Sequence, residues 1–248
     1  MRCLLRIVIL VAALVAAPAF AQQLEREPPP ADESPVSGYL AGHPVDYRVI
    51  LAAPPPVDSI EDKADQRVVE DWQKAPETRR QSATLDDHFV YPRFDAAFGR
   101  PVDRQTSPTL IRMLTRGLRD VAATTFSAKD HFQRPRPFQR VQLQHLCGGD
   151  VPPKPEPHPS GGSSYPSGHS AYGWAVAMML ARVAPERSAA LMARADEYAE
   201  SRVICGMHFP SDVSAGQAVA AAVVNHLDAL PEFQADLARA RAELAASR

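Results

Sequence analysis

Proline placement is the feature that most restricts what this chain can fold into. Prolines stand in the first turn of several runs whose apolar residues recur at helical spacing, at Pro108, Pro166, Pro185, Pro210 and Pro231. Proline is tolerated there because the N–H group that it lacks would have no intrahelical acceptor. No run of the chain alternates apolar and polar residues as a half-buried strand would. The sequence therefore predicts an all-α fold.

Helical spacing also predicts where the helices lie. We expect them over residues 58–72, 85–98 with a bend at Pro92, 106–131, 169–183, 185–203, 210–230 and from 231 onward. Pro135 and Pro137 end the third of these helices and force extended backbone at Arg134 and Arg136. Residues 138–164 are expected to form a loop, because they become rich in Pro, Gly and Ser.

The length of the chain suits one domain. Its 248 residues suffice for one buried core, and the sequence shows neither an internal repeat nor a second domain. Residues 22–56 contain two runs of three prolines and are expected to form an extended N-terminal arm along the domain. Residues 57–248 are expected to form a single compact helical bundle.

The first residues, 1–21, have the pattern of a secretory signal peptide. Arg2 and Arg6 flank a short apolar run, and Ala19-Phe20-Ala21 offers a small-x-small cleavage site. We expect cleavage after Ala21 and a periplasmic or secreted protein. An uncleaved membrane anchor is the alternative, but the apolar run is short for a membrane span. No later apolar run approaches that length, so we expect a mature protein that is soluble and free of the membrane.

The charge balance excludes one class of partner. Loss of Arg2 and Arg6 with the signal reduces 27 Lys and Arg to 25, against 29 Asp and Glu, which is a net charge near −4. Proteins that bind nucleic acid polymers through bulk electrostatics are basic. We therefore expect no nucleic acid polymer as a partner.

The cysteines favour a disulfide. Cys3 leaves with the signal, so that Cys147 and Cys205 remain in an oxidising compartment. A pair of cysteines in such a compartment is more often bridged than free. Two separate buried thiols are the alternative, because the sequence does not give the geometry.

The stretch from Ser201 to Asp212 places Arg202, His208 and Asp212 at spacings that suit one chemical task. His208 can act as a nucleophile. Asp212, in the first turn of the following helix, can accept a hydrogen bond from one nitrogen of the His208 ring. The other ring nitrogen is then free to attack phosphorus. The planar fork of Arg202 suits an anion.

Two other stretches supply what phosphoryl transfer still requires, which is positive charge and N–H donors around the phosphoryl oxygens. Lys129 and Arg136 add cations. The backbone N–H groups of Ser167, Gly168 and His169 begin a helix, where the dipole favours an anion. His169 can also protonate the leaving alkoxide.

This scheme requires a neutral His208 and a protonated His169. With the pKa of both near the ordinary value of about 6.5, activity should prefer mildly acidic to neutral pH. Each residue alone also has a structural interpretation: the histidines as packing residues, Arg202 and Asp212 as an ordinary ion pair, or Asp212 as a helix cap. Their combination favours the catalytic interpretation.

The order of these residues forms three parts. Lys129 is followed after six residues by Arg136-Pro137, then come Pro166-Ser167-Gly168-His169, and then Arg202, five residues, His208, three residues and Asp212. This arrangement resembles the tripartite motif of the type 2 phosphatidic acid phosphatase superfamily. Within it the chain closely resembles the bacterial class A nonspecific acid phosphatases over most of the mature chain. Departures at Pro135, Ser163, Ser170 and Phe209-Pro210 remove no catalytic group.

The resemblance implies a helical bundle of the type 2 phosphatidic acid phosphatase and vanadium haloperoxidase kind. It implies an exported acid phosphatase, often oligomeric, that hydrolyses small phosphomonoesters of broad range, sometimes favouring nucleotides. The reaction would need no metal and no other cofactor, and would pass through a phosphohistidine on His208. Asp212 would orient that ring and His169 would protonate the leaving group. The phosphate would be held by Lys129, Arg136, Ser167, Gly168 and Arg202.

Two other functions are alternatives. A vanadium-dependent haloperoxidase shares the motif, because vanadate resembles the transition state of phosphoryl transfer, but such enzymes resemble longer chains. An exported phosphate-binding protein would need neither an acid nor a nucleophile. The sequence leaves open the physiological substrate, the balance of phosphotransfer and hydrolysis, the oligomeric state and the conformation of residues 147–164.

Overall fold

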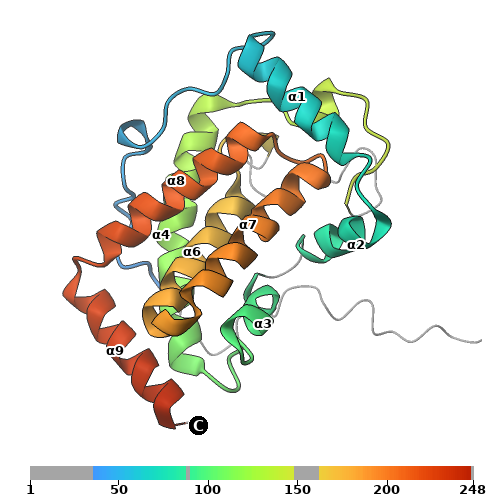
Figure 1. Cartoon of the computed structure of the whole chain (residues 1–248). Coiled ribbons are helices and arrows are strands. Elements are labelled where there is room, and N and C mark those ends of the chain that lie inside the picture. Colours follow the sequence, from blue (N-terminus) through green and yellow to red (C-terminus); the bar gives the residue numbers. More distant parts are fainter. Residues whose placement is uncertain (1–35, 88–89, 148–161, 247–248) are drawn as a thin grey trace, which may run out of the picture.

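Helix α6 (Gly168–Val183) forms the centre of the fold in the computed structural model, which describes residues 36–87, 90–147 and 162–246 (Figure 1). It packs most extensively against α7 (Ser188–Ile204) and α8 (Pro210–Leu227), and then against α4 (Pro108–Phe132). Helix α9 (Pro231–Ala246) packs on α4. Because neighbours surround α6, nearly all of its faces are apolar, and one large cluster of buried side chains joins these helices.

The remaining helices lie around this core. They are α1 (Ile60–Trp72), α2 (Glu77–Leu85), α3 (Asp95–Phe98) and α5 (Pro137–Arg140), with 3-10 turns at Tyr47–Val49, Tyr91–Phe94 and Pro185–Arg187. The described ranges contain no strand. The predicted all-α fold is therefore confirmed, and the predicted proline starts recur at the N-terminal ends of α4, α6, α8 and α9 and of the turn before α7.

The prediction of one helix over residues 85–98, bent at Pro92, is wrong in extent, because only residues 91–98 of this range form helical structure of their own, first 3-10 and then α. Leu85 ends α2, and a 3-10 turn and the short α3 follow. Asp86 is the C-cap of α2, and its buried carboxylate pairs with Arg93 at 2.9 Å and also with Arg194. These contacts with distant residues are not visible in the local apolar spacing.

Apolar spacing gives no signal for two short helices. In α2 only Ala83 is buried, so no periodic apolar face exists. Helix α5 occupies the four residues Pro137–Arg140, at the start of the stretch predicted to be a loop.

Helix α1 lies where predicted, but its buried face differs. Ile60 and Val68, taken as part of an apolar face, are 81% and 40% exposed. The buried residues are Val69 and two acids, Asp62 and Asp65. The acids are buried because they pair with arginines beside the site described below.

The N-terminal ends of α6 and α8 lie against each other. The N–H of Ser167 donates to the carbonyl oxygen of Asp212 over 2.9 Å, and Ser170 Oγ donates to that of Val213 over 2.8 Å. Gly216 permits this approach, because a Cβ there would lie 2.3 Å from the carbonyl oxygen of Ser167. The close contact brings two of the three motif parts together.

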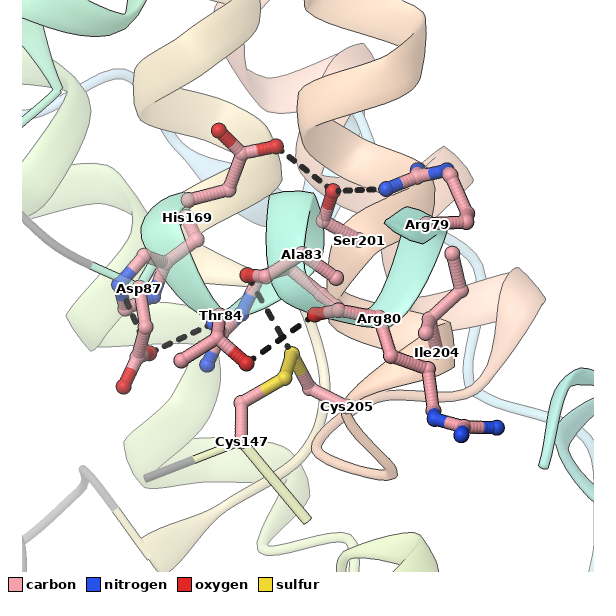
Figure 2. Close-up of a disulfide and its surroundings, with 12 residues drawn as sticks. Arg79, Arg80, Ala83, Thr84, Asp87, Cys147, His169, Ser201, Ile204 and Cys205 are labelled. Carbon is pink, nitrogen blue, oxygen red and sulfur yellow. Dashed lines mark hydrogen bonds and ion pairs between the residues drawn. A yellow bond between two sulfur atoms is a disulfide. The ribbon is translucent and has the colours of Figure 1, made fainter. Parts of the chain in front are cut away.

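The predicted disulfide between Cys147 and Cys205 is present, with the two Cα atoms 4.8 Å apart. Figure 2 shows it beside α2, where Cys205 Sγ lies 3.6 Å from the carbonyl oxygen of Ala83. The two cysteines are 58 positions apart and enclose α6 and α7. The disulfide thus closes a covalent loop that contains α6 and α7, both of which carry candidate site residues.

Replacing Cys147 and Cys205 together with Ser is expected to lower the free energy of unfolding by up to about 4 kcal/mol, because closing a loop of this length restricts the unfolded chain. Thermal unfolding of the oxidised wild type and of the double variant measures the difference. Reductant should lower the midpoint of the wild type only. Equal midpoints without reductant would show that the bridge adds no stability.

The described part of the N-terminal arm, residues 36–56, contacts the bundle through Tyr39. The backbone N–H of Tyr39 donates to Asp120 over 2.7 Å, and its hydroxyl donates to Asp236 over 2.7 Å. The guanidinium of Arg116 lies 3.9 Å from the ring centroid. These contacts attach the arm to α4 and α9.

The proposed signal peptide lies outside the described residues. Cleavage after Ala21, export, and the structure of the arm before residue 36 stay predictions, as does the division into segments 1–21, 22–56 and 57–248. Over the described ranges, none of the helices has both the length and the apolar content needed to cross a membrane.

Candidate active site

The three motif parts meet where helix ends converge. The elements contribute Lys129 (last turn of α4), Arg136 (extended backbone before α5), Ser167 to His169 (start of α6), Arg202 (last turn of α7), His208 (before α8) and Asp212 (first turn of α8). Hydrogen bonds join the parts. Lys129 Nζ donates to the carbonyl oxygen of Ser163, which precedes the second part, and Arg136 contacts His208 in the third.

The imidazole of His208 is held in one tautomer. Its Nδ1 lies 2.7 Å from the carbonyl oxygen of Ser164, which can only accept, so Nδ1 carries the proton. Its Nε2 lies 3.1 Å from Nη1 of Arg136, which can only donate, so Nε2 carries the lone pair. The side chain is only 2% exposed. The buried ring therefore presents an unprotonated nitrogen to a cation that was predicted to bind phosphate.

Asp212 is not the hydrogen-bond partner of His208. The distance from Asp212 Oδ2 to His208 Nδ1 is 3.8 Å, which is beyond hydrogen-bond range. The carboxylate instead accepts from Ser164 Oγ at 2.6 Å, from the N–H of Phe209 at 2.7 Å and from Arg134 Nη1 at 2.6 Å. The expected hydrogen bond is thus replaced by a connection through Ser164, whose hydroxyl contacts Asp212 and whose carbonyl contacts the ring.

Burial lowers the pKa of His208 well below its ordinary value, and the positive charges of Arg136, Lys129 and Arg202 lower this pKa further. The ring is therefore neutral near neutral pH. A neutral imidazole is what nucleophilic attack requires.

Arg202 is the most deeply buried of the three predicted phosphate-binding cations, at 1% exposed. Its Nη1 lies 2.6 Å from Asp87 Oδ1. Its Nε, also buried, has no hydrogen-bond partner among the described residues. A buried donor without an acceptor is costly, so this guanidinium has unused capacity for an anion.

The N-terminal end of α6 offers fewer donors than predicted. The N–H of Ser167 is already bonded to the carbonyl oxygen of Asp212, and Ser167 Oγ caps the helix by accepting from the N–H of Ser170. The N–H groups of Gly168 and His169 occupy the first helical positions, which have no intrahelical acceptor. Ser167 therefore shapes the helix start, and its N–H is already used within the protein.

His169 lies beside Asp87, as Figure 2 shows, with its Nε2 3.8 Å from Asp87 Oδ1 and a third of its side chain exposed. Burial, followed by the charge of Arg202, lowers the pKa of His169 to about 3, and Asp87 acts in the opposite direction. The expectation of an ordinary pKa for both histidines is therefore wrong for the site without substrate.

Sequence reasoning missed three residues that contact this site. Ser164, Arg134 and Asp87 each touch a predicted residue, yet none lies at a motif position. The sequence pattern that could have identified Arg134 is Arg134-Pro135-Arg136-Pro137. It places a second arginine two positions before Arg136, on the same extended segment. The described residues hold no group of three or more His, Cys, Asp or Glu side chains placed as metal ligands.

The helical bundle thus buries a neutral histidine beside several cations, and comparison with known proteins shows to which class of protein the chain belongs. Residues 112–232 match the PAP2 superfamily. The "Non-specific acid phosphatase" of Providencia stuartii is 36% identical over 207 residues, covering 81% of this chain and 82% of the relative. The "Non-specific acid phosphatase" of Salmonella typhi is 35% identical over a match that covers 70% of this chain and 66% of the relative. The "Acid phosphatase" of Zymomonas mobilis is 31% identical over a match that covers 81% of this chain and 76% of the relative.

The chain belongs to the non-specific acid phosphatase family of the PAP2 superfamily and is a phosphoric monoester hydrolase. The predicted class A resemblance is confirmed. Similarity to phosphatases also favours hydrolysis over the haloperoxidase alternative.

Proposed function

We propose that the chain hydrolyses phosphomonoesters in two in-line steps through a phosphohistidine on His208. Nε2 attacks phosphorus while the bond to the ester oxygen breaks, and the leaving alcohol takes a proton. Water then attacks the phosphoryl group, which releases phosphate and restores the ring. The observation that carries this proposal is the fixed tautomer of a buried, neutral His208 whose Nε2 lone pair faces a guanidinium.

Substrate binding must free that lone pair. In the structure Arg136 Nη1 lies 3.1 Å from Nε2 of His208 and 3.1 Å from the carbonyl oxygen of Met207. A phosphate oxygen is a stronger acceptor than a neutral ring nitrogen, because the hydrogen bond is then charge-assisted on both sides. Binding therefore moves an N–H of Arg136 from the ring to the phosphate. Lys129 and Arg202 neutralise the remaining charge.

The proton for the leaving group arrives with the substrate. A phosphomonoester has its second pKa at about 6, so below this pH it binds as a monoanion. Its negative charge opposes the cations that depress the pKa of His169. His169 can then accept the proton and pass it to the leaving oxygen. This explains how an acid with a depressed pKa supports catalysis at mildly acidic pH.

Quenching the reaction of p-nitrophenyl phosphate into alkali tests the intermediate, because phosphohistidine survives alkali and decays in acid. We expect a phosphorylated peptide containing His208, and full turnover in EDTA, since no step uses a metal. Vanadate should compete with substrate. Phosphate on another residue, or activity that EDTA removes, would contradict the mechanism.

We further propose export, supported by the signal-like residues 1–21, and a broad range of small phosphomonoesters that includes nucleotides. The breadth is supported by relatives named non-specific acid phosphatases. A homo-oligomer stays a prediction.

A further inference from the structure

A buried network of charged side chains lies next to the proposed nucleophile and includes none of the phosphate-binding residues. It consists of Arg134, Arg140, Asp62, Asp65 and Asp212, and we call it the Arg134 network. Asp62 and Asp212 have fully buried side chains, and that of Arg134 is 5% exposed. Burying charged groups costs free energy, so a buried network of ion pairs is weak evidence for stabilisation of the fold. Its place beside His208 suggests a role in the reaction.

Arg134 connects α1 with the start of α8. Its Nη2 donates to Asp65 Oδ2 over 3.0 Å and to Asp62 Oδ1 over 3.3 Å. Its Nη1 donates to Asp212 Oδ1 over 2.6 Å and to Ser211 Oγ over 2.7 Å. These contacts use both terminal nitrogens of the guanidinium, so α1 fixes the direction in which Arg134 approaches Asp212.

Ser164 is the point where this network reaches His208. The N–H of Ser164 donates to the carbonyl oxygen of Arg134 over 2.7 Å. Its hydroxyl donates to Asp212 Oδ2 over 2.6 Å, and its carbonyl oxygen accepts from His208 Nδ1 over 2.7 Å. Arg134 therefore acts on Ser164 twice, directly through its backbone and indirectly through Asp212.

We propose that Arg134 is a positioning residue for the nucleophile: it fixes Asp212 and Ser164, and thereby holds the carbonyl that sets the tautomer and direction of the His208 ring. This role rests on the proposed phosphohistidine mechanism. Because Arg134 contacts neither the ring nor a predicted phosphate ligand, its effect is on the rate of attack rather than on phosphate binding.

Charge gives Arg134 a second way to act. Burial raises the pKa of Asp212, while Arg134 foremost, then the Ser164 hydroxyl and the N–H of Phe209, lower it. Loss of the guanidinium removes the positive charge that keeps this carboxylate ionised. A protonated Asp212 would be a weaker acceptor for the Ser164 hydroxyl.

Arg140 provides a matched control. It donates to both carboxylate oxygens of Asp62 over 2.7 Å, and its guanidinium lies 5.5 Å from the Phe209 ring centroid, where that of Arg134 lies at 4.3 Å. Its hydrogen bonds go to Asp62, which is connected to Asp212 only through Arg134. If the network served stability alone, both variants would unfold at lower temperature, and Arg134→Gln would show no selective loss of rate.

We would compare Arg134→Gln, Arg134→Lys and Arg140→Gln by steady-state kinetics, alkaline-quench phosphorylation rates, the inhibition constant of inorganic phosphate, and thermal unfolding. We expect Arg134→Gln to lower kcat and the phosphorylation rate by about 10–100-fold while the phosphate inhibition constant changes by less than about 3-fold. Arg134→Lys should recover part of the rate. Arg140→Gln should keep kcat within about 3-fold of wild type even where its unfolding midpoint falls.

Nitrogen-15 NMR of histidine side chains adds a readout that stability alone does not move. We expect the His208 Nδ1–H signal of the wild type to weaken or shift in Arg134→Gln and to persist in Arg140→Gln. If Arg134→Gln does not fold, Ser164→Ala, which removes only the hydroxyl contact with Asp212, should lower kcat several-fold without changing phosphate inhibition.

An unchanged phosphorylation rate in folded Arg134→Gln, or in Ser164→Ala where Arg134→Gln does not fold, overturns the inference. Equal losses of rate in Arg134→Gln and Arg140→Gln overturn it as well. In both cases wild-type phosphohistidine remains, and the proposed function stands. Absence of phosphohistidine in the wild type overturns the proposed function and the role of Arg134 with it.

Discussion

The His208→Ala variant is expected to lose about four orders of magnitude or more in kcat, because it lacks the attacking nitrogen, whose lone pair faces Arg136 in the wild type. Turnover of p-nitrophenyl phosphate and alkaline-quench labelling measure the loss.

Phosphate binding provides the control. Lys129, Arg136 and Arg202 remain in His208→Ala, and Arg136 no longer shares an N–H with the ring, so the variant should bind inorganic phosphate at least as well as the wild type. Replacement of the exposed His226 with Ala should leave turnover unchanged. Turnover of His208→Ala within tenfold of the wild type would exclude His208 as the nucleophile.

That the candidate residues lie close together could be predicted, because the proposed chemistry requires particular residue types at short spacings. Arg202 and His208 lie only six positions apart, at a helix end and in the turn that follows, so local geometry brings both to one place. The helix starts could be predicted for a similar reason, since Pro108 and Pro210 act through local backbone restriction.

The contacts between these residues could not be predicted in the same way. A spacing of four places side chains together only inside a helix, and α8 begins at Pro210, after His208. Asp212 therefore points to Arg134 and Ser164, while the ring meets a backbone carbonyl that no sequence pattern marks.

The burial of two acids in α1 could not be predicted from the sequence either. Asp62 and Asp65 look like solvent-facing acids near a helix start. Their burial is favourable because Arg134 and Arg140, about 70 to 80 positions later in the chain, pair with them. The low pKa of His169 has the same origin, because the cations that depress it come from separate segments. Effects that depend on residues far apart in the sequence can be predicted only once the fold is known.

His169→Ala is expected to reduce kcat/KM for an alkyl phosphate by about 10²–10⁴-fold and for p-nitrophenyl phosphate by much less. An alkoxide is a strong base and needs a proton as it leaves, whereas nitrophenolate leaves without one. The parameter kcat/KM reports the phosphorylation step even where hydrolysis of the phosphohistidine limits kcat. Plotting it against the pKa of the leaving alcohol, for the wild type and the variant, measures the change in slope.

The pH dependence gives an independent check on the same residue. The pKa of His169 is depressed in the free site, so the proton must enter with the substrate monoanion. Wild-type kcat/KM for the alkyl phosphate is therefore expected to fall as pH rises through ~6, where the monoanion is lost. In His169→Ala the alkyl phosphate should be poor at every pH, because the monoanion's proton no longer has a path to the leaving oxygen. Equal losses on both substrates would assign His169 to phosphate binding instead of proton transfer.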